Sequence, residues 1–274
     1  MAKTVVKKVQ EDDRFVMIPR NLLCGFFDQV GYRKDGKELE VVFQFLIPPV
    51  DEWNTVIAID SSESMRHLWG KTLTGDIPLA VQERYHAQDF VFEEKREGNL
   101  LRFYQPEAYD DAIANGYLKW TDNEIEPKAR EILGYLGKQI DGRETCNLMY
   151  WGFGKGTGWV DFGEVTAEDS EHTAFSGPEP LTFGSDSKLL PILQYLVAKF
   201  VDVPKTMVVI LTDGRFSDVE DVKTFCMNLA ILIKAKQRNF MKFVLIGMGK
   251  DLDPKTLAEF DGIHTGPTSE LFAH

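Results

Sequence analysis

Three oxygen-bearing side chains follow an apolar segment at alternate positions. The segment 55–60 reads TVIAID and ends on Asp60, and Ser62 and Ser64 come next in the run Asp60-Ser61-Ser62-Glu63-Ser64. Alternate side chains of an extended segment point to the same side, so these three can converge on one point. One carboxylate and two hydroxyls form a hard-oxygen set, which suits Mg²⁺ or Mn²⁺ and does not suit zinc.

A second carboxylate, Asp213, follows another apolar segment, 206–212, which reads TMVVILT. Gly214 comes directly after it and permits a tight turn that would leave Asp213 facing the same crevice. Open parallel sheets bind ligands beyond the carboxyl ends of their strands. If the two segments are neighbouring parallel strands, Asp60 and Asp213 belong to one site.

A third loop precedes an apolar helical pattern and reads FGSDSKL over residues 183–189. A hydroxyl or a carboxylate at this place would lie at a helix N-terminus and could complete a metal shell. Ser187 and its neighbour Asp186 both have a suitable oxygen, and the residues alone leave both open.

The elements that must position these loops alternate along the chain. Five segments have strand-like composition, and a sixth is a shorter candidate for an antiparallel edge strand: 40–47, 55–60, 145–153, 206–212, 240–247 and 158–165. The segments 55–60 and 206–212 are continuous and apolar, as is typical of strands covered on both faces. The pattern predicts an α/β fold with a doubly wound, mostly parallel central sheet flanked by helices.

Three helices are expected between these strands. One begins near Pro127, a favoured first position, and runs to about residue 140. Another covers 188–200, where Pro191 is tolerated because it falls in the first turn. The third follows Ser217 and Glu220, which match a capping box.

Two stretches exceed a minimal α/β repeat. Residues 1–53 form an N-terminal extension with a helix-like segment NLLCGFFDQV at 21–30, and residues 66–124 form a large insertion directly after the first candidate loop. Both are rich in aromatic residues, so we expect both to pack on the core of a single domain that covers 1–274. The insertion leaves from the predicted metal face, and we expect it to set the choice of partner.

Charge and composition narrow the function classes. The net charge of −12 argues against nucleic acid as a partner, because phosphate binding needs clustered Lys and Arg. The sequence has no run long and apolar enough for a signal peptide or a membrane span. Three scattered cysteines indicate reduced thiols, and the expected location is the cytoplasm.

The three loops together resemble a known metal site. The run Asp60-x-Ser62-x-Ser64 with Met65, then a hydroxyl loop, then Thr212-Asp213-Gly214, is similar to the metal-ion-dependent adhesion site of von Willebrand factor type A domains. The resemblance covers about 55–64 and 182–260, including the strand FVLIGMG at 243–249. The segments SESMRHLW and TDGRFSDVED are most similar to intracellular bacterial members associated with tellurite resistance and to copines.

The resemblance implies a Rossmann-like fold and a set of metal ligands. Asp60, Ser62 and Ser64 would surround Mg²⁺ or Mn²⁺, with Ca²⁺ as a further candidate, and Asp213 would lie opposite, partly through water. The family has Thr in the third loop, and Ser187 takes that place when counted back from the following apolar positions, with Asp186 as a rival. The implied function is binding of an Asp or Glu side chain of a partner protein, without enzymatic activity.

Two other functions stay open. A metal-dependent hydrolase of the phosphatase type would want a second Asp two residues after Asp60, where this chain has Ser62. Its hydroxyls would also need a base beside them. The third alternative is an assembly scaffold of the same fold that binds no metal.

Overall fold

The computed structural model describes residues 15–19, 27–35, 38–45, 53–96, 99–179, 182–250, 252, 254–260, 264–266, 269–270 and 272–273. The chain divides into two compact units. The first unit comprises Met1–Met65 and Pro127–His274, and the second comprises Arg66–Glu126.

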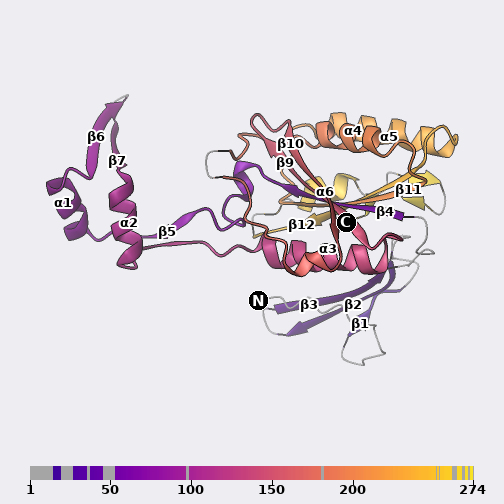
Figure 1. The fold of residues 1–274 in the computed structure, drawn as a ribbon, viewed down its shortest axis with the longest axis horizontal. Coiled ribbons are helices and arrows are strands. Elements are labelled where there is room, and N and C mark those ends of the chain that lie inside the picture. Colours follow the sequence, from indigo (N-terminus) through magenta and orange to yellow (C-terminus); the bar gives the residue numbers. More distant parts are fainter. Residues whose placement is uncertain are drawn as a thin grey trace. The chain divides into compact units, whose positions relative to one another are not determined.

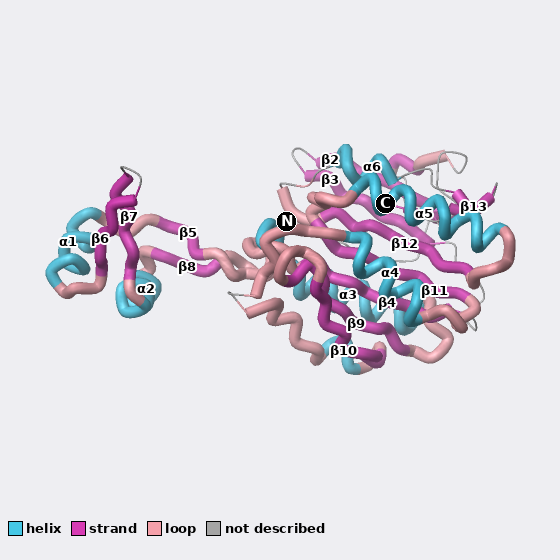
Figure 2. Tube along the Cα trace, turned by 90° about the horizontal axis from the view of Figure 1, so that it is seen from above, coloured by secondary structure: helices cyan, strands magenta, loops and turns pink. Residues whose placement is uncertain are grey.

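A six-stranded sheet forms the centre of the first unit. Its strand order is β10-β9-β4-β11-β12-β15, in which β10 is antiparallel to β9 and the other neighbours are parallel. Figure 2 shows β10 to β12 side by side across the unit. The strands are β4 (Trp53–Asp60), β9 (Thr145–Phe153), β10 (Gly158–Thr166), β11 (Lys205–Thr212), β12 (Phe240–Gly247) and β15 (Phe272–Ala273). The prediction of an α/β fold with a mostly parallel central sheet is confirmed.

The order of the strands creates a switch point between β4 and β11. After β4 the chain adds β9 and β10 on one side, and it then returns to place β11, β12 and β15 on the other. Ligands of open α/β sheets bind at such a point, beyond the carboxyl ends of the strands. Asp60 ends β4 and Asp213 follows β11, so both aspartates flank this switch point.

Helices lie on both faces of the sheet because its central strands are apolar on both sides. Figure 1 shows α4 (Leu189–Lys199) and α5 (Val219–Lys234) on one side and α3 (Ile125–Gln139) on the other. One core cluster joins α4, α5 and the short helix α6 (Pro254–Phe260) to alternate strand residues that include Val56, Ala58, Val208 and Ile210. The intervening residues Ile57, Ile59, Val209 and Leu211 are also buried, which requires cover on the opposite face.

The helix starts differ in detail from the predictions. The predicted capping box at Ser217 and Glu220 is wrong. Helix α5 begins at Val219, after Asp218, and the Ser217 hydroxyl donates to Asp186 Oδ2 at 2.8 Å. The Asp218 carboxylate accepts the backbone N–H groups of Leu189 and Leu190 at 3.0 and 2.8 Å. It therefore satisfies two donors at the start of α4, a helix that precedes it in the chain.

The helix predicted from Pro127 begins two residues earlier, at Ile125. The side-chain oxygen of Asn123 accepts the N–H groups of Ile125 and Glu126 at 3.1 and 3.0 Å, which fixes the first turn. Pro127 stays within that turn, where its missing N–H costs no intrahelical bond.

The N-terminal residues form a separate three-stranded antiparallel sheet. Its strands are β1 (Val16–Met17), β2 (Phe27–Asp35) and β3 (Glu38–Phe45). The helix-like interpretation of 21–30 is wrong for Phe27–Val30, which belong to β2, whereas 21–26 lie outside the described residues. Pairing with the β-branched residues of β3 outweighs the helical spacing of the apolar residues. Residues 46–47 of the predicted strand 40–47 also lie outside the description.

The second unit nearly coincides with the predicted insertion. It contains the pair β5 (Leu73–Gly75) and β8 (Leu118–Trp120), the helices α1 (Leu79–Ala87) and α2 (Pro106–Ala114), and the hairpin of β6 (Val91–Arg96) and β7 (Asn99–Tyr104). Tyr85, Val91 and Ala108 form the buried centre of its own small core. The packing of the insertion on the main core stays a prediction. Among the described helices of the chain, none is long and apolar enough to cross a membrane.

Candidate metal centre

Asp60 lies at the centre of the candidate site and is fully buried. Its Oδ1 accepts the backbone N–H of Ser62 at 2.9 Å. Its Oδ2 accepts the hydroxyls of Thr212 at 2.8 Å and of Ser187 at 3.2 Å. The Asp60 carboxylate therefore connects three parts of the chain: the loop that follows β4, the loop that precedes α4, and the last residue of β11.

The charge on Asp60 is costly in this environment. Burial raises the pKa of Asp60 to about 6, hydrogen bonds from Ser62 and Thr212 oppose the rise, and the charge of Asp213 adds to it. A divalent cation at this place would relieve both the desolvation of Asp60 and its repulsion by Asp213.

Ser62 and Ser64 lie on the same loop with their hydroxyl oxygens 3.1 Å apart, where either could donate to the other. Ser62 is buried and precedes the 3-10 turn Glu63–Met65, and Ser64 is half-buried within that turn. The loop is held by Ser61, whose N–H donates to Trp151 O at 2.7 Å. Its two hydroxyls thus stand directly after the Asp60 carboxylate on a fixed backbone.

Asp213 is also buried, and its charge acts on Asp60. Its Oδ1 accepts the backbone N–H of Arg215 at 3.1 Å, and its Oδ2 lies 3.9 Å from Arg215 Nε. Gly214 has a φ of 78°, in the left-handed region that glycine adopts readily, so it turns the chain sharply after Asp213.

The third loop presents two candidate oxygens in different surroundings. The Ser187 hydroxyl is buried against Asp60. The carboxylate of Asp186 is occupied within the loops: its Oδ1 accepts the N–H of Ser187 and its Oδ2 accepts the Ser217 hydroxyl, both at 2.8 Å. The structure thus brings Ser187 to Asp60 and uses Asp186 to tie two loops together. Which of the two ligates a metal stays a prediction.

Thr212 belongs to the motif that the sequence shows, but it is not among the predicted metal ligands. Its hydroxyl donates to Asp60 Oδ2 and accepts the N–H of Gly214 at 3.1 Å. The available signal was a hydroxyl at the end of an apolar strand, one residue before the chosen carboxylate. Thr212 therefore couples the turn after β11 to Asp60.

Two glycines were also missed, and both shape the site. A Cβ on Gly152 would lie 3.1 Å from Asp60 Oδ1, and one on Gly184 would lie 1.6 Å from the carbonyl oxygen of Gly152. Gly152 is near the end of β9, just before the turn of residues 154–157 that leads to β10. Its backbone borders the Asp60 carboxylate. A glycine at the end of a strand on the same sheet edge was the missed signal.

The donor set fits a hard divalent cation. Every candidate ligand offers oxygen, from the two carboxylates of Asp60 and Asp213 and the hydroxyls of Ser62, Ser64 and Ser187. No group of three or more His, Cys, Asp or Glu residues suited to a metal occurs in the part of the chain that the structure describes. A metal held at this edge would therefore depend on hydroxyl oxygens as well as on carboxylates.

No protein-family model matches the sequence, and no curated protein matches it significantly.

Proposed function

We propose that the chain is a metal-dependent protein-binding module with a doubly wound fold of the von Willebrand factor A type. Asp60, Ser62, Ser64, Ser187 and Asp213 hold Mg²⁺ or Mn²⁺, and Ca²⁺ is also compatible with oxygen ligands. The metal keeps an open position, which an Asp or Glu side chain of a partner protein fills. The module binds and performs no reaction.

The observation that carries this proposal is the pair of buried carboxylates at the switch point of the sheet. Asp60 and Asp213 are each almost completely buried, and the charge of Asp213 contributes to the raised pKa of Asp60. Buried charges in proteins are generally paired or coordinate metal ions. Serine hydroxyls beside Asp60 supply the neutral oxygens that complete such a shell.

The charge of the ligand set permits an anionic partner. Two carboxylates and three neutral hydroxyls balance a divalent ion without giving the site a net negative charge. A further carboxylate can therefore bind the metal at an open position, with the surrounding loops setting its direction. A phosphatase would need a second carboxylate on the first loop, and Ser62 occupies that position.

Calorimetric titration with Mn²⁺ tests the proposal. Wild-type protein should bind the ion, and Asp60→Ala should abolish binding because it removes the central charge. Asp202→Ala is the matched control, since Asp202 is exposed and precedes β11 at the opposite end of that strand. Equal Mn²⁺ affinity in wild type and Asp60→Ala, or no binding by the wild type, contradicts a metal site here.

A capture experiment tests the partner class. A partner should elute with chelator, bind Asp202→Ala as it binds wild type, and fail to bind Asp60→Ala. Substituting the partner's acidic residues by Asn or Gln should abolish capture. A partner that binds equally well in chelator supports the metal-free scaffold instead.

A further inference from the structure

Arg215 lies next to the second carboxylate of the proposed site. Its Nε is 3.9 Å from Asp213 Oδ2, and its side chain is 53% exposed whereas that of Asp213 is only 3% exposed. The other oxygen of Asp213 accepts the backbone N–H of the same residue. Both oxygens of this buried carboxylate therefore face groups of Arg215.

We infer that the positive charge of Arg215 competes with the metal ion for the carboxylate of Asp213. This inference rests on the proposed function. In the metal-free protein its guanidinium partly neutralises Asp213. A divalent cation that approaches Asp213, directly or through water, meets a positive charge already close to the same oxygen. Arg215 thus lowers the affinity of the site for the metal and makes that affinity depend on salt.

The size of the effect follows from Coulomb's law. Arg215 Nε lies 3.9 Å from Asp213 Oδ2, so a divalent ion bound at that carboxylate would meet the positive charge within a few ångströms. In surroundings close to water, because the guanidinium is half exposed, such a repulsion opposes metal binding about tenfold. Removing the positive charge should strengthen Mn²⁺ binding by that factor, and the gain should shrink as salt rises. Damage to the fold would weaken metal binding, so a gain in affinity distinguishes electrostatic competition from a structural role.

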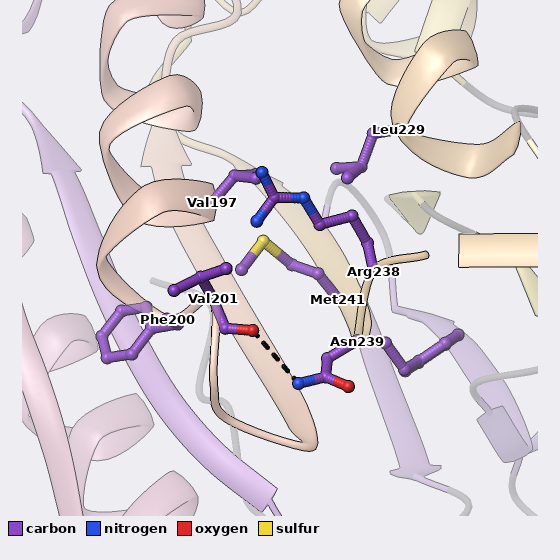
Figure 3. A pocket seen from close by; sticks show the side chains of 8 residues that line it. Val197, Phe200, Val201, Leu229, Arg238, Asn239 and Met241 are labelled. Atoms are coloured by element: carbon purple, nitrogen blue, oxygen red, sulfur yellow. Dashed lines mark hydrogen bonds between the residues drawn. The ribbon is translucent and has the colours of Figure 1, made fainter. Parts of the chain in front are cut away.

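Arg238 provides a control of the same residue type. It precedes β12 and lines a shallow hollow with Asn239, Met241 and residues from α4 and α5 (Figure 3). Because β11 and β12 are parallel, the start of β12 and the end of β11 lie at opposite edges of the sheet. Arg238→Gln therefore removes the same charge far from Asp213.

The experiment compares Mn²⁺ affinity by calorimetry in wild type, Arg215→Gln, Arg215→Lys and Arg238→Gln, at low and at physiological salt. We expect Arg215→Gln to bind about tenfold more tightly at low salt and by a smaller margin at higher salt. Arg215→Lys, which keeps the charge, should stay within about threefold of wild type. Arg238→Gln should match wild type.

The two levels of the hypothesis fail differently. If wild type and all three variants bind no Mn²⁺, the proposed function is wrong, and the competition falls with it. If wild type binds Mn²⁺ and Arg215→Gln binds it equally or more weakly, the metal site stands and the competition is wrong. A gain of the same size in Arg238→Gln would also overturn it, because the effect would then reflect net charge alone.

Discussion

Replacing Asp60 by Asn should stabilise the metal-free protein while it abolishes the response to metal. Asn keeps the shape of the side chain, and its oxygen can still accept the N–H of Ser62. Its amide nitrogen would face the hydroxyls of Thr212 and Ser187, which can turn to accept. The substitution therefore removes a buried negative charge and keeps most of the hydrogen-bond geometry.

The magnitude follows from the pKa of Asp60, which rises from 3.8 to about 6 on folding. The free-energy equivalent of this shift is about 3 kcal/mol, at roughly 1.4 kcal/mol per pKa unit. Because the folded-state pKa is the higher one, the stabilising contribution is complete below about pH 4. It is lost as the pH rises to about 6. Relative to wild type, Asp60→Asn should thus gain up to about 3 kcal/mol at pH 7 and little at pH 4.

Urea unfolding in the presence of EDTA at pH 4, 5, 6 and 7 measures the stability difference, and thermal unfolding with added Mn²⁺ measures the metal response. Asp202→Asn, at an exposed position, is the control and should follow wild type in both. If Asp60→Asn is less stable than wild type at pH 7, the charge of Asp60 is favourably solvated and the burial argument is refuted. If Mn²⁺ stabilises the variant as much as wild type, Asp60 is not a ligand.

Four further outcomes are expected. Ser187→Ala should weaken Mn²⁺ binding more than Asp186→Ala, because the Ser187 hydroxyl donates to Asp60 whereas the Asp186 carboxylate accepts the N–H of Ser187 and the hydroxyl of Ser217, and calorimetry that gives the reverse order would make Asp186 the ligand. Gly184→Ala should cost about 2 kcal/mol or more in urea unfolding, because its Cβ would overlap Gly152 O. Gly154→Ala, which meets no atom within 4 Å, should cost only about 1 kcal/mol of backbone strain, and equal losses would contradict the clash. Cys146 and Cys226 should resist alkylation in the folded protein, because burial raises the pKa of each thiol to about 12, and rapid native-state labelling by mass spectrometry would contradict this. Exchanging the exposed Phe92, Leu100 and Trp120 of the second unit for polar residues should abolish partner binding and leave Mn²⁺ affinity unchanged, and capture that persists would remove the insertion from partner choice.

The central strands were predictable because their signal is local. TVIAI and TMVVIL are buried along their whole length in the structure, and continuous apolar runs rich in β-branched residues are typical of strands that are covered on both faces. The strand 27–35 was not predictable in this way. The apolar residues at 22, 23, 26 and 27, where the strand begins, match a helical spacing in the sequence, and only the pairing of β2 with β3 decides for the strand.

The positions of the two carboxylates of the candidate site were predictable from the strands that they follow. Asp60 and Asp213 follow strands whose carboxyl ends must meet at one edge if the strands are parallel neighbours. The contacts of Thr212, Gly152 and Gly184 depend on which loops touch, and those loops are far apart in the sequence. Ser217 was not predictable for the same reason. Its local sequence matches a capping box, but its hydroxyl donates to Asp186, which belongs to a preceding loop.

Hydroxyl groups around a buried carboxylate suit a site that must exist with and without its metal. In the structure Ser187 and Thr212 donate to Asp60 Oδ2, and either of Ser62 and Ser64 can donate to the other. A hydroxyl carries one rotatable hydrogen and two acceptor lone pairs, so rotation about one bond turns a donor toward the carboxylate into an oxygen ligand for a cation. An asparagine or a backbone amide at these positions could not exchange roles without moving its heavy atoms. The same few serines can therefore limit the cost of the Asp60 charge in the free protein and coordinate the ion in the bound one. For this reason Asp60→Asn and Ser187→Ala should have opposite effects on the stability of the metal-free protein: the first removes the buried charge, and the second removes a donor that stabilises it.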